Sequence, residues 1–273
     1  MWKRILTMSL VLVMVLLLTT CTKEPSAQEI VDGVIESFDE IRTYQFDVDE
    51  TIDITFEDEE GVSETTYTFG SNGAVDVENR QMRYDTTIEE IVETGQSEVT
   101  WGGEQYCVNG MLYTKPKLSG EETTWMKEEA TEEWWESQQM GLVRAQIELI
   151  ETARVEVIGN EKVDDIDCYV LEVNPDLRQL WQQYNQLIFQ EAPDVTEEYL
   201  QEVFLNFSIK QWVAKDTYYL MKAEIDIATE LPADSPGPSA VEITMVFLSY
   251  NYNQPVSIVL PPEAEEAIEM PTE

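Results

Sequence analysis

The segment 43-TYQFDVDETIDITF-56 decides the fold, because apolar and polar residues alternate along it. All of its apolar side chains occupy even positions, and all of its odd positions are polar. A period of two places alternate side chains on opposite faces of a β-strand. The segment is therefore predicted to be one long strand with a buried face, formed by Tyr44, Phe46, Val48, Ile52, Ile54 and Phe56.

An amphipathic helix is predicted just before this strand. Ser26 and Glu29 have the spacing of a capping box, and the apolar residues that follow recur at helical spacing. Further alternating segments follow the strand, and the Asn109-Gly110 pair predicts a tight hairpin turn between two of them. These patterns predict an antiparallel sheet whose apolar face needs a cover.

Helical segments interrupt the sheet in the middle of the chain. Apolar stripes predict helices over about residues 131–152, from Pro175 onward and after Asp194, before alternation returns. We find no internal repeat and no interdomain linker. The sequence therefore predicts a single α+β domain over residues 27–260, with an acidic tail at 261–273.

Residues 1–20 have the pattern of an export signal. Lys3 and Arg4 precede a long apolar run that contains no acidic residue. The tetrapeptide LTTC that ends at Cys21 resembles a lipobox, in which the Cys is lipid-modified, with residues 21–26 as a tether. The alternative is an uncleaved N-terminal anchor. Both interpretations predict membrane attachment, with the domain facing the extracytoplasmic side.

The composition argues against several classes of function. The chain has 55 acidic and 16 basic residues, a formal charge of −39, and no His. Without His it cannot build a Ser/His/Asp or Cys/His catalytic site, and without clustered Lys and Arg it is poorly suited to nucleic acids. Carboxylate pairs arise by chance in so acidic a chain, and no S-x-x-K, G-x-S-x-G or phosphate-loop motif is present. We therefore expect no enzyme, no cofactor and no nucleic-acid partner.

The acidic charge itself has two explanations. The protein is adapted to a salty medium, in which ions screen the repulsion, or its acids bind cations. Asp47, Asp49 and Asp53 resemble a calcium-binding cluster, but they alternate with apolar residues and fit the solvent-exposed face of a strand better. The sequence therefore predicts no metal site.

Four motifs resemble those of a family of exported lipoproteins. They are VNGMLYTK at 108–115, DCYVLEV at 167–173, IKQWVAKDTYYLMKAEIDI at 209–227 and YNQPVSIVLPPEA at 252–264. The family comprises relatives of the LolA/LolB lipoprotein-localisation factors and of the mycobacterial LppX/LprG-type lipid-binding lipoproteins. The resemblance implies an unclosed, strongly curved antiparallel half-barrel, whose helices cover the concave face and enclose space for acyl chains.

Three functions stay open at this point. The chain is a carrier or sensor of a lipid-like apolar ligand, a structural or protein-binding envelope lipoprotein, or, least in keeping with its motifs, a carboxylate-based hydrolase. Its oligomeric state is left open. Each candidate tryptophan also fits plain core packing. The residues expected to line a ligand cavity are Phe46, Ile54, Trp134, Trp135, Trp181, Leu187 and Trp212.

Two further features concern covalent chemistry. Cys107 and Cys168 are the thiols left once Cys21 is acylated, and export favours a disulfide between them over two buried free thiols. Asn206-Phe207-Ser208 has the pattern of an N-glycosylation site, with Asn206 as the acceptor.

The lipobox interpretation predicts the effect of Cys21→Ser. Removing the acylated thiol should release the protein from the membrane into the medium, or leave an uncleaved precursor. Cell fractionation and the mass of the purified chain measure both results. Unchanged size and fractionation would contradict lipidation of Cys21.

Overall fold

One wide sheet organises the chain. A computed structural model describes residues 24–58, 61–92, 97–139, 143–176, 178, 203–231 and 238–270. In these residues twelve strands form a sheet of order β12-β6-β5-β4-β3-β2-β1-β11-β10-β9-β8-β7. The strands are β1 (Thr43–Asp58), β2 (Gly61–Asp76), β3 (Gln81–Val92), β4 (Ser97–Val108), β5 (Met111–Leu118), β6 (Met126–Glu129), β7 (Arg154–Val163), β8 (Ile166–Asn174), β9 (Phe204–Ala214), β10 (Leu220–Glu230), β11 (Ala240–Tyr250) and β12 (Ile268–Glu269).

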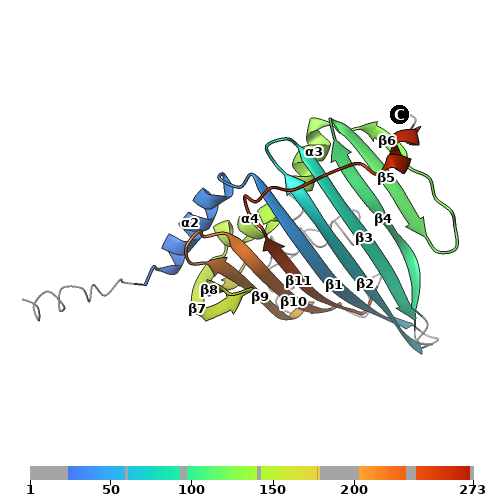
Figure 1. The fold of residues 1–273 in the computed structure, drawn as a ribbon. Coiled ribbons are helices and arrows are strands. Elements are labelled where there is room, and N and C mark those ends of the chain that lie inside the picture. The colour runs from blue at the N-terminus through green and yellow to red at the C-terminus, as the bar shows by residue number, and fades with distance from the viewer. Residues whose placement is uncertain are drawn as a thin grey trace, which may run out of the picture.

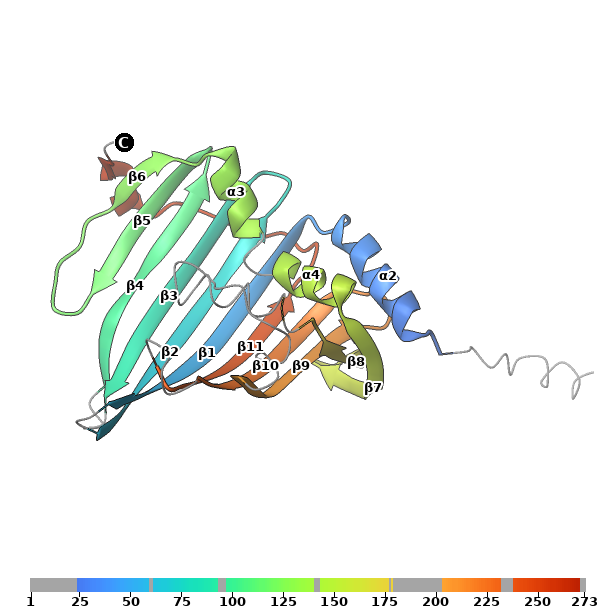
Figure 2. The same ribbon diagram turned by 180° about the vertical axis from the view of Figure 1, so that it is seen from behind.

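In the part of the chain that the structure describes, three α-helices lie on one side of this sheet: α2 (Ala27–Phe38), α3 (Glu132–Gln139) and α4 (Ala145–Thr152). The sheet is bent into an open trough, with the helices on its concave side (Figures 1 and 2). The structure thus confirms the predicted α+β class and the curved antiparallel half-barrel. The helices predicted from Pro175 and after Asp194 fall almost wholly outside the described residues.

The predicted first helix and first strand are both present. Glu29 N–H donates to Ser26 Oγ at 3.3 Å, and Ser26 N–H donates to Glu29 Oε2 at 2.7 Å, which completes the capping box at the start of α2. Strand β1 pairs with β2 along its whole length and with β11 on its other side. Because this pairing has no bulge, alternate residues of β1 stay on the same face throughout.

The main core lies between the sheet and the helices. Gln211 of β9 marks this face, because its Nε2 donates to the Gln146 carbonyl of α4 at 2.9 Å. We call this face the helix-facing side. Phe46 of β1 and Ile225 of β10 lie on it, both about 1% exposed, and pack in one cluster with Ile30 of α2. Each such side chain contributes roughly 2 kcal/mol of hydrophobic stabilisation.

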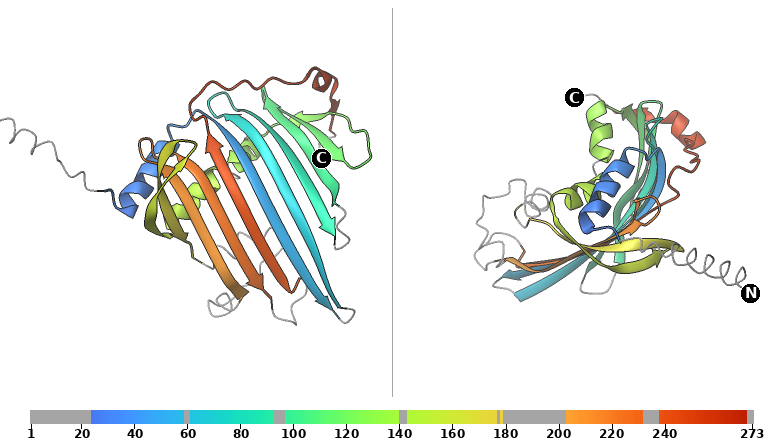
Figure 3. Two further views of the ribbon diagram at one scale, coloured as in Figure 1. Left: turned by 60° about the horizontal axis from the view of Figure 1, so that its bottom comes forward. Right: turned by 90° about the vertical axis from the view of Figure 1, so that its left-hand side faces the viewer.

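The C-terminal segment packs on the opposite, convex side of the sheet. Residues 261–273 were expected to be an acidic tail outside the domain, but the 3₁₀ helix η2 (Pro262–Glu266) and strand β12 hold this segment in place through Met270. Trp125 is buried beneath Ala264 and Ala267, and its carbonyl accepts from Ile268 N–H at 2.9 Å. Figure 3 shows η2 on the side of the sheet away from the α-helices.

The predicted disulfide between Cys107 and Cys168 is wrong. Both are free, buried thiols. Cys107 pairs with Met82 on the helix-facing side, whereas Cys168 shares the opposite face with Trp212. The strands β4 and β8 stand seven places apart in the sheet. A bridge needs Cα atoms within about 7 Å and Cβ vectors that point together, which this placement excludes.

The structure therefore predicts two reactive thiols at Cys107 and Cys168. Alkylation of the denatured, unreduced protein, followed by peptide mass mapping, should label both positions completely. Recovery of a linked peptide pair that contains both residues would contradict this placement.

Gly73 of β2 provides a test of the packing on β1. A Cβ at this position would lie 2.5 Å from the Arg83 carbonyl oxygen and 2.7 Å from the Phe46 ring. We expect Gly73→Ala to lower the free energy of unfolding by about 1–3 kcal/mol, because backbone and a buried ring must shift.

Gly70→Ala on the same strand is the matched control, since a Cβ there meets nothing within 4 Å. Denaturant unfolding followed by circular dichroism measures both variants. Equal stabilities would show that Phe46 does not press against Gly73.

Candidate ligand-binding site

The helix-facing side carries two of the residues predicted to line a cavity. Phe46 and Ile54 share this face of β1. Phe46 is buried in the main core, whereas Ile54 is half-buried and lies beyond the residues packed against that core. Phe46 thus helps to hold the helices on the sheet, and Ile54 is available to a ligand.

The two tryptophans of α3 also differ. Trp135 is 6% exposed and belongs to the main core, while Trp134 packs against that core from its edge. Their ring centroids are 6.4 Å apart. The structure places both on the helical cover, as the sequence predicts, with Trp135 in the role of a core residue.

Trp212 does not lie in the helix-covered space. Its neighbour Gln211 contacts α4, so Trp212 points to the other face of β9. There its Nε1 donates to Glu161 Oε2 at 2.9 Å, and Lys222 Nζ lies 4.5 Å from its ring centroid. The prediction that Trp212 lines the cavity is therefore wrong, because its position along the strand has the opposite parity.

Three of the predicted residues cannot be placed. Trp181, Leu187 and Cys21 lie outside the described residues. Asn206 is exposed on β9, which is compatible with glycosylation, and its modification stays a prediction.

A row of side chains crosses the helix-facing side from β9 to β5. The strand registers place these residues opposite one another, one on each of eight adjacent strands. We call them the cross-strand row: Ile209, Ile225, Met245, Glu50, Phe69, Ile88, Trp101 and Leu118.

Exposure differs between the two ends of the row, and Ile88 between them is 2% exposed. Ile209 and Ile225 are each 1% exposed beneath the helices, whereas Trp101 is 53% and Leu118 is 43% exposed at the other end. Two large apolar side chains are thus exposed next to each other on the concave surface, and exposed apolar patches are typical of interaction sites. The sequence alone does not reveal this row, because its members are far apart in the chain and only the registers between strands bring them together.

Glu50 is the single charged member of the row. It lies between Met245 and Phe69, and burial raises the pKa of its carboxyl. Glu90, on the same face, has a hydrogen-bond partner, because its Oε1 accepts from the Tyr67 hydroxyl at 3.1 Å. Glu50 was detectable in the sequence, because the other even positions from Tyr44 to Phe56 are apolar.

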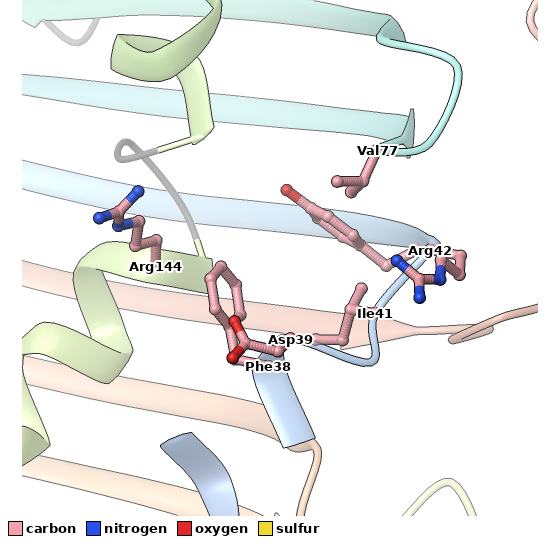
Figure 4. Close-up of a pocket in the computed structure, with 7 residues that line it drawn as sticks. Phe38, Asp39, Ile41, Arg42, Val77 and Arg144 are labelled. Carbon is pink, nitrogen blue, oxygen red and sulfur yellow. The ribbon is translucent and has the colours of Figure 1, made fainter. Parts of the chain in front are cut away.

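A small pocket opens at one end of the trough (Figure 4). Its volume is about 280 Å³, and it lies between the end of α2, the start of β1 and the N-terminal end of α4. Tyr44 is a buried part of its wall, and burial raises the pKa of its hydroxyl. Arg144 is engaged with Glu148, its Nε donating to Oε1 at 3.0 Å. The lining residues are Phe38, Asp39, Ile41, Arg42, Tyr44, Val77 and Arg144.

The described residues show neither a metal centre nor a membrane-spanning helix. No group of three or more Cys, Asp or Glu in this part of the chain could hold a metal ion. None of the helices described above has the length and hydropathy needed to cross a membrane.

The fold is similar to several solved structures. The lipoprotein LppX from Mycobacterium tuberculosis shares 12% identity and a TM-score of 0.46, with 87% of this chain and 100% of that chain covered. LprF from Mycobacterium bovis shares 13% identity and a TM-score of 0.42, with 86% and 96% covered. A LolA-superfamily protein from Nitrosomonas europaea shares 15% identity and a TM-score of 0.22, with 87% and 96% covered.

LppX and the LolA-superfamily protein belong to groups that the sequence resembles. With TM-scores below 0.5, the similarities carry no argument about function. No curated protein matches the chain. A family model does match residues 26–269, and it covers every helix and strand described above. The chain therefore belongs to DUF6612, a family of unknown function.

Proposed function

We propose that this protein is a cell-envelope lipoprotein that binds a lipid-like apolar ligand on the helix-facing side of its sheet. The observation that carries the proposal is the exposed end of the cross-strand row. Trp101 and Leu118 stand beside each other on β4 and β5, in register with the buried Ile88 of β3. A ligand there would cover apolar surface that otherwise faces water.

The apolar surface extends along the strands as well as across them. Ile54 is half-buried, and Phe56, the next residue of β1 on this face, is 41% exposed. Figure 2 shows the concave side of the sheet, with α2 and α4 toward β7–β11 and α3 near one end of β3 and β4. We place the ligand at the part of β4 and β5 where Trp101 and Leu118 are exposed.

Export and attachment through Cys21 remain part of the proposal. A chain that is held at the outer face of a membrane has direct access to lipid. The charge of −39 disfavours an anionic ligand, since burying an anion close to many carboxylates is costly. The proposed ligand is therefore an amphiphile or lipid without net negative charge.

Leu118→Asp tests this proposal in the full chain. Because Leu118 is 43% exposed, the substitution should change the free energy of unfolding by no more than about 0.5 kcal/mol. A carboxylate in the apolar contact area should lower lipid occupancy about tenfold or more. Native mass spectrometry of the protein released from its own membrane measures the bound lipid.

Val62→Asp is the matched control. Val62 is 57% exposed, and it lies on the opposite face of β2 from Phe69. Its substitution adds the same charge and should leave lipid occupancy unchanged. A wild-type chain that retains a protein partner and no lipid would favour the structural or protein-binding alternative. Equal occupancy in wild type and Leu118→Asp would also contradict a ligand at this site.

A further inference from the structure

One acidic side chain interrupts an otherwise apolar surface. Seven of the eight members of the cross-strand row are apolar, and the exception, Glu50, stands in the middle of the row. Beyond it, Ile88 is buried, and Trp101 and Leu118 are exposed. The side chains that flank Glu50 on its own strand are Val48 and Ile52, which pack against the main core. Its carboxylate is therefore surrounded by apolar groups along the strand and across it.

Glu50 has no hydrogen-bond or ion-pair partner among the described residues. On the helix-facing side of strands β9 to β3, Glu90 is the other acid with a described side chain, and Tyr67 already donates to it. The basic residues of these strands point to the opposite face: Arg83, Lys210 and Lys222. The described protein therefore supplies no cation to Glu50.

We propose that Glu50 binds the cationic amino group of an amphiphile, whose apolar chain extends across the sheet to the exposed Trp101 and Leu118. This inference rests on the proposed function, and it names the chemical class of the ligand. Phe69, Ile88, Trp101 and Leu118 follow Glu50 in consecutive strands, at about 4.8 Å per strand, and of these Trp101 and Leu118 are exposed. One polar anchor at the end of an apolar track fixes the direction in which a long-chain ligand lies.

Charge favours an amine over the alternatives. An unpaired carboxylate is costly in an apolar environment, and the raised pKa of Glu50 reflects that cost. An ammonium group beside it stabilises the ionised form and gains a charge-assisted hydrogen bond. The overall charge of −39 attracts a cation and repels a fatty-acid carboxylate. An alcohol of equal chain length can donate a hydrogen bond to Glu50, but it has no positive charge to pair with the carboxylate.

Photocrosslinking distinguishes these ligands in the full chain. The protein is placed in phosphatidylcholine nanodiscs that contain a diazirine-bearing long-chain amine, alcohol or carboxylic acid of equal chain length and equal mole fraction. Mass spectrometry then quantifies the label on peptides that contain Trp101 and Leu118. In the wild type we expect about tenfold more label from the amine than from the alcohol, and least from the acid.

Two single-charge variants locate the effect. Glu50→Gln should lower labelling by the amine to the level of the alcohol, because it keeps the shape of the side chain and removes its charge. Asp49→Asn removes one charge from the adjacent, exposed residue on the other face of β1, and it should keep the tenfold preference. Glu50→Asp retains the charge and should retain most of the preference. Circular dichroism verifies that each variant is folded.

The possible failures are distinct. If none of the three probes labels these peptides in the wild type, the proposed lipid-binding function fails. If the amine and the alcohol label the wild type equally, the function stands and the role of Glu50 is overturned. An equal loss in Asp49→Asn and Glu50→Gln would attribute the preference to overall charge, and it would also overturn the proposal.

Discussion

The architecture depends on one constraint, which is that a wide open sheet must remove one apolar face from water. Strand β1 pairs without a bulge on both sides, and it presents that face from Tyr44 to Phe56 with Glu50 as the exception. The described α-helices are short, with 12, 8 and 8 residues. They bury Phe46 and Ile225 completely, but Trp101 and Leu118 remain half exposed on the same face. The difference between the covered and the uncovered part of one surface is what suggests a binding function.

The periodicity of the sequence was sufficient to predict much of the fold. Alternation identified β1, and the capping box identified α2, because both patterns are local. The curvature came from the family resemblance, since no local pattern encodes it. Trp212 was misplaced because it has the opposite parity to Ile209 and Val213, and residues of opposite parity lie on opposite faces of a strand. The disulfide was mispredicted because the number of thiols says nothing about the faces on which they lie.

The cross-strand row illustrates what a single sequence cannot show. Its eight members come from eight strands, and their alignment depends on every register between β9 and β5, including a bulge beside Ile88. Glu50 was visible as an exception to the alternation of β1, but the apolar track next to it was not. The alternation along β1 also explains how so acidic a chain keeps an apolar face. Asp47, Asp49 and Asp53 all lie on the face of β1 that is opposite to the helices.

The two ends of the open sheet have a consequence for self-association. An unprotected edge strand offers free backbone groups to another chain and promotes aggregation. One edge is formed by β12, which has only two residues and carries Glu269. The other is formed by β7, where a bulge between Val157 and Gly159 interrupts the register with β8. The sheet is open, but both of its edges are poor templates for the addition of another strand. One edge strand, β12, is very short, and the other, β7, is irregular.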